Sequence, residues 1–175
     1  MSDNASRLHP GEAFPDLSFQ RVGGGRVSPS DGDGWRMLVV YRGKHCPMCT
    51  RYLATLERLR EQFRDAGIQV MAVSADPLEK AAAEVDSEGW SFPVGYDMDL
   101  QEMKTLGLYV SEPRSPEETD RPFAEPAVFV INPDDQLQTV DVSNAPFSRP
   151  GLEELLQGLK FVQEKNYPVR GTLAA

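Results

Sequence analysis

Hydrophobic residues along this chain follow two distinct spacings. Three short apolar runs have the length and the β-branched content of buried strands: 36–42, 68–74 and 127–131. Elsewhere apolar residues recur at steps of three and four, which predicts helices over about 47–66, 77–88, 99–106 and 150–165. Weaker signals predict a glycine-turn hairpin over 14–27, a short strand at 92–97, and a hairpin partner for the third run at 137–142.

The order of these elements predicts one α/β domain. Strands separated by helices pair in parallel through right-handed crossovers, and the last hairpin adds an antiparallel edge. We therefore expect a central mixed sheet flanked by helices, with an N-terminal β-hairpin extension, over residues 14–175. Residues 1–13 are expected to form a loosely held tail, and the proline-rich segment 109–126 a long surface loop.

Composition narrows the classes of protein that fit. The chain has 175 residues, of which 40% are hydrophobic, and this is enough for the core of one domain. Its formal net charge of −9 argues against a nucleic-acid or anionic-membrane partner, since both require basic surface. The polar N-terminus shows no secretory signal, and the apolar runs are too short for a membrane span. Two cysteines are too few for a disulfide scaffold, so we expect a cytoplasmic setting.

The two cysteines, Cys46 and Cys49, lie where the first apolar run leads into a predicted helix. Pro47 is typical of a first helical position, so Cys46 falls near the N-cap, where backbone N–H groups and the helix dipole favour a thiolate. Arg42 and Lys44 add positive charge, and the pKa of Cys46 should therefore be lowered. Cys49 lies one turn further on the same helix face. The pair is predicted to cycle between dithiol and disulfide, with Cys46 as nucleophile and Cys49 as resolving thiol.

Two other interpretations of the C-x-x-C spacing remain open. A structural zinc site needs four ligands, and the only histidines are His45 and His9, so the N-terminal tail would have to fold over the motif. An inert buried pair is the second alternative. The position of the cysteines at a strand-to-helix junction within a βαβ pattern favours the redox interpretation over both. No metal or cofactor is expected.

With this order of elements, the chain resembles the thioredoxin superfamily, in particular the peroxiredoxin-like proteins of the alkyl hydroperoxide reductase/thiol-specific antioxidant (AhpC/TSA) family. The matching features are the Y-R-G-x-x-C-P-x-C stretch at 41–49, the strand at 128–134 and the closing segment around 161–165. The resemblance implies a thioredoxin-like fold and a thiol-dependent antioxidant enzyme. Such an enzyme reduces peroxides or disulfides with a thioredoxin- or glutathione-type thiol donor. Members of this family often pair, so a homodimer is a further expectation.

The same resemblance implies which residues support the cysteines. Those beside the motif are Tyr41, Arg42, Gly43, Lys44, His45 and Pro47. Pro126 matches the cis-proline position that faces the redox motif in thioredoxin-like proteins. The resemblance therefore implies that Glu125–Pro126 packs against the Cys46 sulfur, and a trans proline that ends a loop is the alternative.

The chain departs from the peroxiredoxin pattern close to the cysteines. Peroxiredoxins usually carry a proline and a threonine where this chain has Val39 and Gly43, and an arginine at the position of Pro126. That threonine and arginine orient and polarise the peroxide. Three other arginines are candidates to replace them: Arg42, Arg114 and Arg121.

The chain also departs from thioredoxins, which hold a buried aspartate where it has Val40. The proton relay would then fall to Lys44, Glu125 or solvent. The departures leave a peroxide and a disulfide as equal candidates for the substrate. A redox sensor or binding module that uses the fold without turnover is the alternative function.

Overall fold

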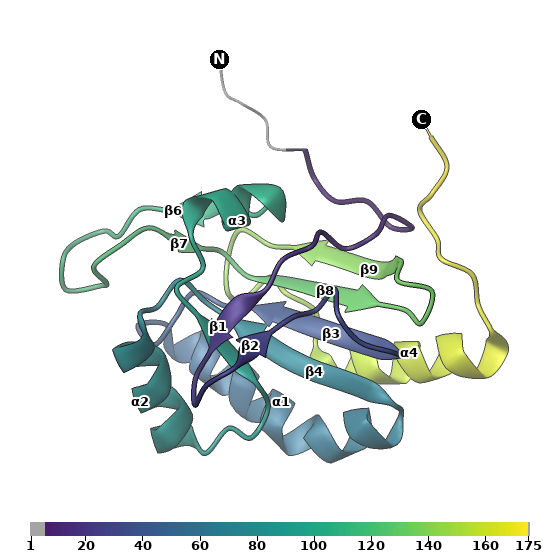
Figure 1. Cartoon of the computed structure of the whole chain (residues 1–175), viewed down its shortest axis with the longest axis horizontal. Coiled ribbons are helices and arrows are strands. Elements are labelled where there is room, and N and C mark those ends of the chain that lie inside the picture. Colours follow the sequence, from purple (N-terminus) through teal and green to yellow (C-terminus); the bar gives the residue numbers. More distant parts are fainter. Residues whose placement is uncertain (1–5, 175) are drawn as a thin grey trace.

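The computed structural model describes residues 6–174, which are built around a seven-stranded sheet (Figure 1). The strands are β1 Phe19–Arg21, β2 Arg26–Val27, β3 Trp35–Val40, β4 Ile68–Val73, β5 Val94–Tyr96, β6 Val110–Ser111, β7 Phe123–Ala124, β8 Ala127–Ile131 and β9 Leu137–Val142. The helices are α1 Pro47–Asp65, α2 Leu78–Glu88, α3 Leu100–Thr105 and α4 Leu152–Lys165. The order across the sheet is β2-β1-β5-β4-β3-β8-β9, and β6 pairs with β7 separately. The first five residues of the expected tail lie outside the described residues.

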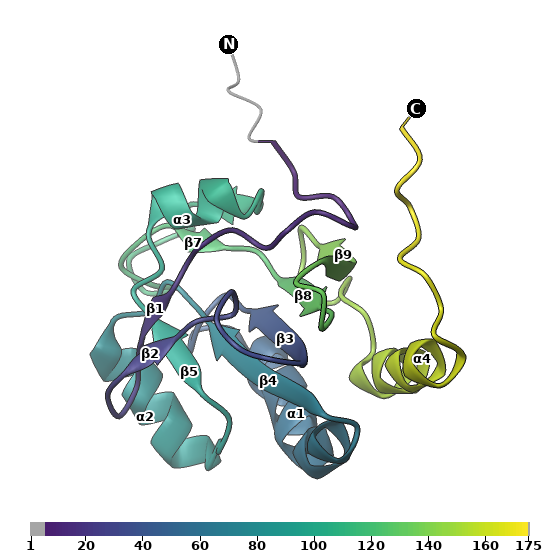
Figure 2. The same cartoon turned by 45° about the vertical axis from the view of Figure 1, so that its right-hand side comes forward.

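Strand β3 lies inside the sheet, where it pairs in parallel with β4 and antiparallel with β8. Its side chains alternate between two cores. Met37 and Val39 pack in the cluster that contains the buried faces of α1 and α4. Leu38 and Val40 pack with α3 and the N-terminal segment on the other face of the sheet (Figure 2). A strand covered on both faces must be apolar throughout, which is why the run was visible in the sequence. The expected mixed sheet flanked by helices is confirmed.

Helix α1 carries the chain away from the end of β3 and buries one apolar stripe. Its buried residues are Cys49, Leu53, Leu56, Leu59 and Phe63. Burying each large apolar side chain contributes about 1.5–3 kcal/mol, so this stripe fixes the helix firmly on the sheet. Pro47 is its first residue, and Gly67 follows its end with a φ of +74°. The N-terminus of α1, with Cys46 as N-cap, is therefore held close to the C-terminal end of β3.

The segment 109–126 is more ordered than its composition suggested. Its two ends form the β6–β7 ladder, in which Val110 pairs with Ala124 and Ser111 with Phe123. Phe123 and Ala124 are buried and belong to the same core cluster as Ala127 and Phe129 of β8. The expectation of a long irregular loop is therefore wrong for the ends of the segment. Its middle contains only turns and bends.

The peptide bond before Pro126 is trans, as are all peptide bonds of residues 6–174. The cis bond implied by the resemblance is therefore not present. Instead an extended dipeptide joins β7 to β8, with Glu125 N–H donating to the Tyr109 carbonyl at 2.8 Å. The Pro126 carbonyl accepts from Ser143 N–H at 2.9 Å.

The N-terminal segment contacts the sheet before β1 begins. Gly11 N–H donates to the Leu137 carbonyl at 2.8 Å, and Leu137 N–H donates to the Glu12 carbonyl at 2.7 Å. Phe14 is buried and packs edge-on against Phe129 at 5.8 Å between ring centroids. These contacts hold residues 11–14 against the β8–β9 hairpin. Within residues 6–174 the structure has no helix long and apolar enough to cross a membrane.

Candidate active site

Cys46 caps α1, and Cys49 lies one turn into the same helix. The Cys46 sulfur accepts a hydrogen bond from Cys49 N–H at 3.3 Å, and the two residues lie within 2.9 Å of each other. Both are free thiols. The helix thus brings the cysteines together as their spacing predicts. However, Cys46 is only 4% exposed and Cys49 is fully buried, so the predicted nucleophile is nearly enclosed rather than exposed.

The surroundings shift the pKa values of the two thiols in opposite directions. A hydrogen bond from the Cys49 thiol is the main cause that lowers the pKa of Cys46, to about 6, against the opposing effect of burial. Cys49 N–H, Arg42 and Arg149 lower it further. The same thiol–thiol hydrogen bond, together with burial, raises the pKa of Cys49. The surroundings therefore favour the thiolate on Cys46 and the proton on Cys49. The predicted direction for Cys46 agrees, although the neighbouring thiol outweighs the helix end.

Arg149 reaches the pair from the loop before α4, and no pattern in the sequence pointed to it. Its Nη2 donates to the Cys49 sulfur at 3.4 Å, and its Nε donates to the Pro146 carbonyl at 2.8 Å. The guanidinium lies over the Tyr52 ring, 4.1 Å from the centroid. Its Nη1 is buried and has no hydrogen-bond partner within residues 6–174. Arg149 thus places a buried cation, with a spare donor, against the sulfur site.

The arginines considered from the sequence are held by acids. Arg42 binds Glu125 through two hydrogen bonds, of 2.7 and 2.8 Å, and Ser111 Oγ donates to the same carboxylate at 2.6 Å. Glu125 is buried, so this bidentate pair fixes Arg42 beside the motif. Glu125 is consequently committed to Arg42, which argues against its use as a proton relay.

The other two candidate arginines are also paired. Arg114 binds Glu118 at 3.2 Å, and Arg121 binds Asp97 at 2.9 Å. Within the described residues, therefore, Arg149 is the arginine that contacts a cysteine sulfur, and it was not among the three candidates.

Gly43 is required by its surroundings. Its φ is +137°, and a Cβ at this position would lie 2.7 Å from the Asp76 Oδ1. Asp76 is buried and accepts a hydrogen bond from Lys44 N–H at 2.7 Å, so the carboxylate fixes the backbone just before the motif. The threonine that peroxiredoxins usually carry here would collide with this carboxylate. The Lys44 side chain itself is exposed.

His45 and Pro47 flank Cys46 on opposite sides in the sequence. The His45 ring meets the Phe123 ring edge-on at 4.6 Å between centroids. Burial lowers the pKa of His45, and neither ring nitrogen has a hydrogen-bond partner within residues 6–174. A neutral imidazole therefore lies next to Cys46, whereas Pro47 is exposed. A shallow pocket beside the motif is lined by Lys44, His45, Lys80, Arg114, Ser115, Glu117 and Glu118.

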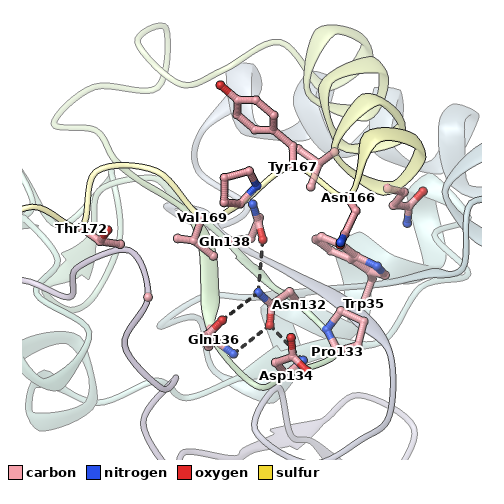
Figure 3. A pocket seen from close by; sticks show the side chains of 14 residues that line it. Trp35, Asn132, Pro133, Asp134, Gln136, Gln138, Asn166, Tyr167, Val169 and Thr172 are labelled. Atoms are coloured by element: carbon pink, nitrogen blue, oxygen red, sulfur yellow. Dashed lines mark hydrogen bonds between the residues drawn. The ribbon is translucent and has the colours of Figure 1, made fainter.

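A larger pocket lies at the opposite end of β3 and is unrelated to the cysteines. Figure 3 shows Asn132 in its centre, with Trp35 and Tyr167 on its walls. The polar groups bond to one another: Asn132 Nδ2 donates to Gln136 and Gln138. Trp35 begins β3, whereas the motif follows its end, a separation of about 16 Å along the strand. This pocket therefore adds nothing to the sulfur chemistry.

Residues 6–174 contain no group of three or more histidine, cysteine or acidic side chains arranged to hold a metal ion. The two cysteines face Arg149 and each other rather than a histidine pair. The contacts of the motif are those of a dithiol.

Comparison with known proteins agrees with this site. The family model described as "AhpC/TSA family" matches residues 10–140. The chain is 31% identical over 105 residues to the "Putative peroxiredoxin Rv2521" of Mycobacterium tuberculosis, a match covering 59% of this chain and 67% of that protein. It is 25% identical over 104 residues to the "Thiol-disulfide oxidoreductase ResA" of Halalkalibacterium halodurans, covering 59% of each chain.

A solved structure shows the same fold. The peroxiredoxin 6 of Arenicola marina, in a mutant form with a serine in place of a cysteine, superimposes with a TM-score of 0.74 at 22% identity. This match covers 91% of this chain and 76% of that chain. Together with the family model, which spans most of the chain, these relatives identify an enzyme of the peroxidase and thiol oxidoreductase class. The chain belongs to the AhpC/TSA family of peroxiredoxin-like proteins in the thioredoxin superfamily.

Proposed function

We propose that the protein is a thiol peroxidase in which Cys46 attacks the peroxide and Cys49 resolves the product. The single observation that carries this proposal is the geometry of the pair: Cys46 caps α1, and its sulfur accepts a hydrogen bond from the N–H of the buried Cys49 at 3.3 Å. Only the thiolate attacks a peroxide, and these surroundings lower the pKa of Cys46.

The chemistry proceeds in three balanced steps. The Cys46 thiolate attacks one peroxide oxygen, the O–O bond breaks, and the leaving alkoxide takes a proton, which gives Cys46 sulfenic acid and an alcohol. The Cys49 thiol then attacks the Cys46 sulfur, so that an S–S bond forms, the S–O bond breaks and water leaves. Two thiols of an external donor finally reduce the disulfide and are themselves oxidised to a disulfide. Arg42 and Arg149 supply the positive charge that stabilises Cys46.

The finer assignments complete the proposal. A thioredoxin- or glutathione-type thiol is the donor, the setting is cytoplasmic, and the protein works without a bound cofactor. A homodimer is also proposed, because members of this family often pair. Tyr41 and Pro126, which are buried, support the cysteines by packing, whereas Arg42 supplies charge and Gly43 admits the Asp76 carboxylate.

A second candidate, reduction of protein disulfides, is favoured by two observations. Gly43 replaces the threonine expected of a peroxidase, and Asp76 leaves no room for that threonine. The relative from Halalkalibacterium halodurans is named as a thiol-disulfide oxidoreductase. In this function Cys46 would attack a substrate sulfur, and Cys49 would release the reduced substrate.

The test compares the reduced protein with Cys46→Ser and Cys49→Ser. Peroxide consumption with a thiol donor should disappear in Cys46→Ser, and Cys49→Ser should stop after one turnover with a trapped sulfenate or mixed disulfide. Insulin reduction is measured in parallel. Peroxide loss independent of Cys46 would contradict the peroxidase, and disulfide reduction alone would establish the second candidate. A disulfide that forms but is not recycled by any thiol donor would indicate a redox sensor.

A further inference from the structure

The pocket around Asn132, at the end of β3 away from the cysteines, has no part in the redox chemistry. Its volume of about 650 Å³ lies within the range of roughly 300–1,000 Å³ that is typical of small-molecule sites. Its walls come from the start of β3, the β8–β9 turn, the end of α4 and the C-terminal segment that follows it (Figure 3). The Asn132 pocket is thus a candidate ligand site that the fold assembles from distant parts of the chain.

Amide side chains at the centre of the Asn132 pocket are held in fixed orientations. Asn132 is 6% exposed, and its Oδ1 accepts hydrogen bonds from the backbone N–H groups of Asp134 at 3.0 Å and Gln136 at 3.1 Å. Its Nδ2 donates to Gln136 Oε1 at 3.4 Å and to Gln138 Oε1 at 3.2 Å (Figure 3). The turn therefore fixes Asn132, and Asn132 orients both glutamine side chains.

These amides keep hydrogen-bonding groups that the protein does not use. Gln136 Nε2 and Gln138 Nε2 have no hydrogen-bond partner within residues 6–174. Gln163, on the α4 wall, donates from Nε2 to the Ala66 carbonyl at 2.8 Å, and its Oε1 accepts no hydrogen bond from the described residues. The lining therefore offers donors on one wall and an acceptor on another. A hydroxyl group fits both, because it donates and accepts.

Aromatic side chains supply the apolar part of the lining. Trp35 lies on one wall and Tyr167 on another (Figure 3). Arg170 donates to the Tyr167 hydroxyl at 2.7 Å, and its guanidinium lies 5.6 Å from the centroid of the ring, so the ring is held in place. Aromatic faces beside amide groups suit a ligand that has an apolar C–H face and a polar rim. A pyranose ring has both, since its hydroxyls project around a C–H face.

The charge of the lining favours a neutral ligand. Of the described residues that line the Asn132 pocket, only Asp134 is charged. An anionic ligand would meet this carboxylate with no lysine or arginine in the lining to pair with it, and like charges placed together disfavour binding. A hydroxyl, in contrast, is able to donate a hydrogen bond to Asp134.

We propose that the Asn132 pocket binds a neutral sugar of one or two pyranose rings. The sugar hydroxyls accept from Gln136 and Gln138 and donate to Gln163, and a C–H face of the ring packs against the aromatic walls. The binding involves no covalent or redox step. It does not depend on the proposed peroxidase activity, so a protein that consumed no peroxide would be tested in the same way.

Trp35 provides the signal for the test. The chain has two tryptophans, and Trp90 is only 5% exposed in the core, so Trp90→Phe leaves Trp35 as the single indole. Titration of this variant with maltose should change the Trp35 emission saturably, with a dissociation constant on the order of 1 mM. Glucuronate should bind about tenfold more weakly than glucose, from which it differs by its carboxylate. If Trp90→Phe does not fold, the melting temperature of the wild-type protein reports the same binding, because a ligand of the folded state raises it.

Two variants of the lining test the contacts. Gln138→Leu removes an amide donor at similar size and should weaken maltose binding about 3- to 10-fold, as for loss of one hydrogen bond. Tyr167→Ala removes an aromatic wall and should weaken binding too. The matched control is Gln157→Leu, which changes an exposed amide of α4 outside the lining and should bind maltose as the wild type does.

Three results would overturn the proposal. The first is the absence of both a saturable change in emission and a rise in melting temperature with maltose and with glucose. The second is an affinity for glucuronate equal to that for glucose, or tighter binding of adenosine than of maltose. The third is wild-type affinity for maltose in folded Gln138→Leu and Tyr167→Ala proteins.

Discussion

Replacing Arg149 by methionine should slow formation of the Cys46–Cys49 disulfide. The guanidinium donates to the Cys49 sulfur at 3.4 Å, and Arg149 is only 9% exposed, so solvent screens this contact little. A hydrogen bond to a charged group contributes about 1.5–3 kcal/mol. Since about 1.4 kcal/mol corresponds to a tenfold change in rate, loss of the bond should slow the attack of Cys49 about 10- to 150-fold. Methionine keeps an unbranched apolar stem against Tyr52.

The assay separates the two chemical steps. Reduced protein is mixed with one equivalent of hydrogen peroxide and quenched at intervals with an alkylating reagent, and mass spectrometry then distinguishes thiol, sulfenate and disulfide. Arg149 is only a minor cause of the lowered pKa of Cys46, so the attack of Cys46 on the peroxide should stay fast. Because the attack of Cys49 on the sulfenate slows, Arg149→Met should accumulate sulfenate. The matched control is Arg58→Met, which removes an exposed arginine paired with Glu153. A folded Arg149→Met protein that closes its disulfide at the wild-type rate would refute the reasoning.

Two further predictions concern the thiolate and the backbone before it. Cys49→Ala removes the hydrogen bond that does most to lower the pKa of Cys46, so the midpoint of thiolate absorbance against pH should rise from about 6 towards the ordinary thiol value. An unchanged midpoint would show that another group sets it. Gly43→Ala forces a Cβ to 2.7 Å from Asp76 Oδ1, and it should lower the free energy of unfolding by about 1–3 kcal/mol more than Gly24→Ala. Gly24 has a φ of +104° and no described atom within 4 Å of the added Cβ, so equal losses in urea denaturation would contradict the steric account.

The elements that carry the motif were predictable because each leaves a clear period in the sequence. Strand β3 is buried on both faces and is therefore a continuous apolar run, and α1 buries one stripe and repeats at three and four residues. The strands β6 and β7 were missed because two residues each are too few to show alternation. These two strands are held in place by pairing with each other and by the burial of Phe123 and Ala124 just before β8.

The sequence by itself determined that two cysteines three residues apart begin a helix after a buried strand. That arrangement depends on local spacing alone, and it was enough to indicate a thiolate and its partner. Which other groups meet the sulfurs was decided only by the tertiary structure. Arg149 contacts Cys49 across 100 positions of sequence, and Glu84 bonds to Thr50 across 34. Contacts over such separations depend on how the helices and loops pack on the sheet, and no local pattern distinguishes these side chains from the other charged residues of the chain.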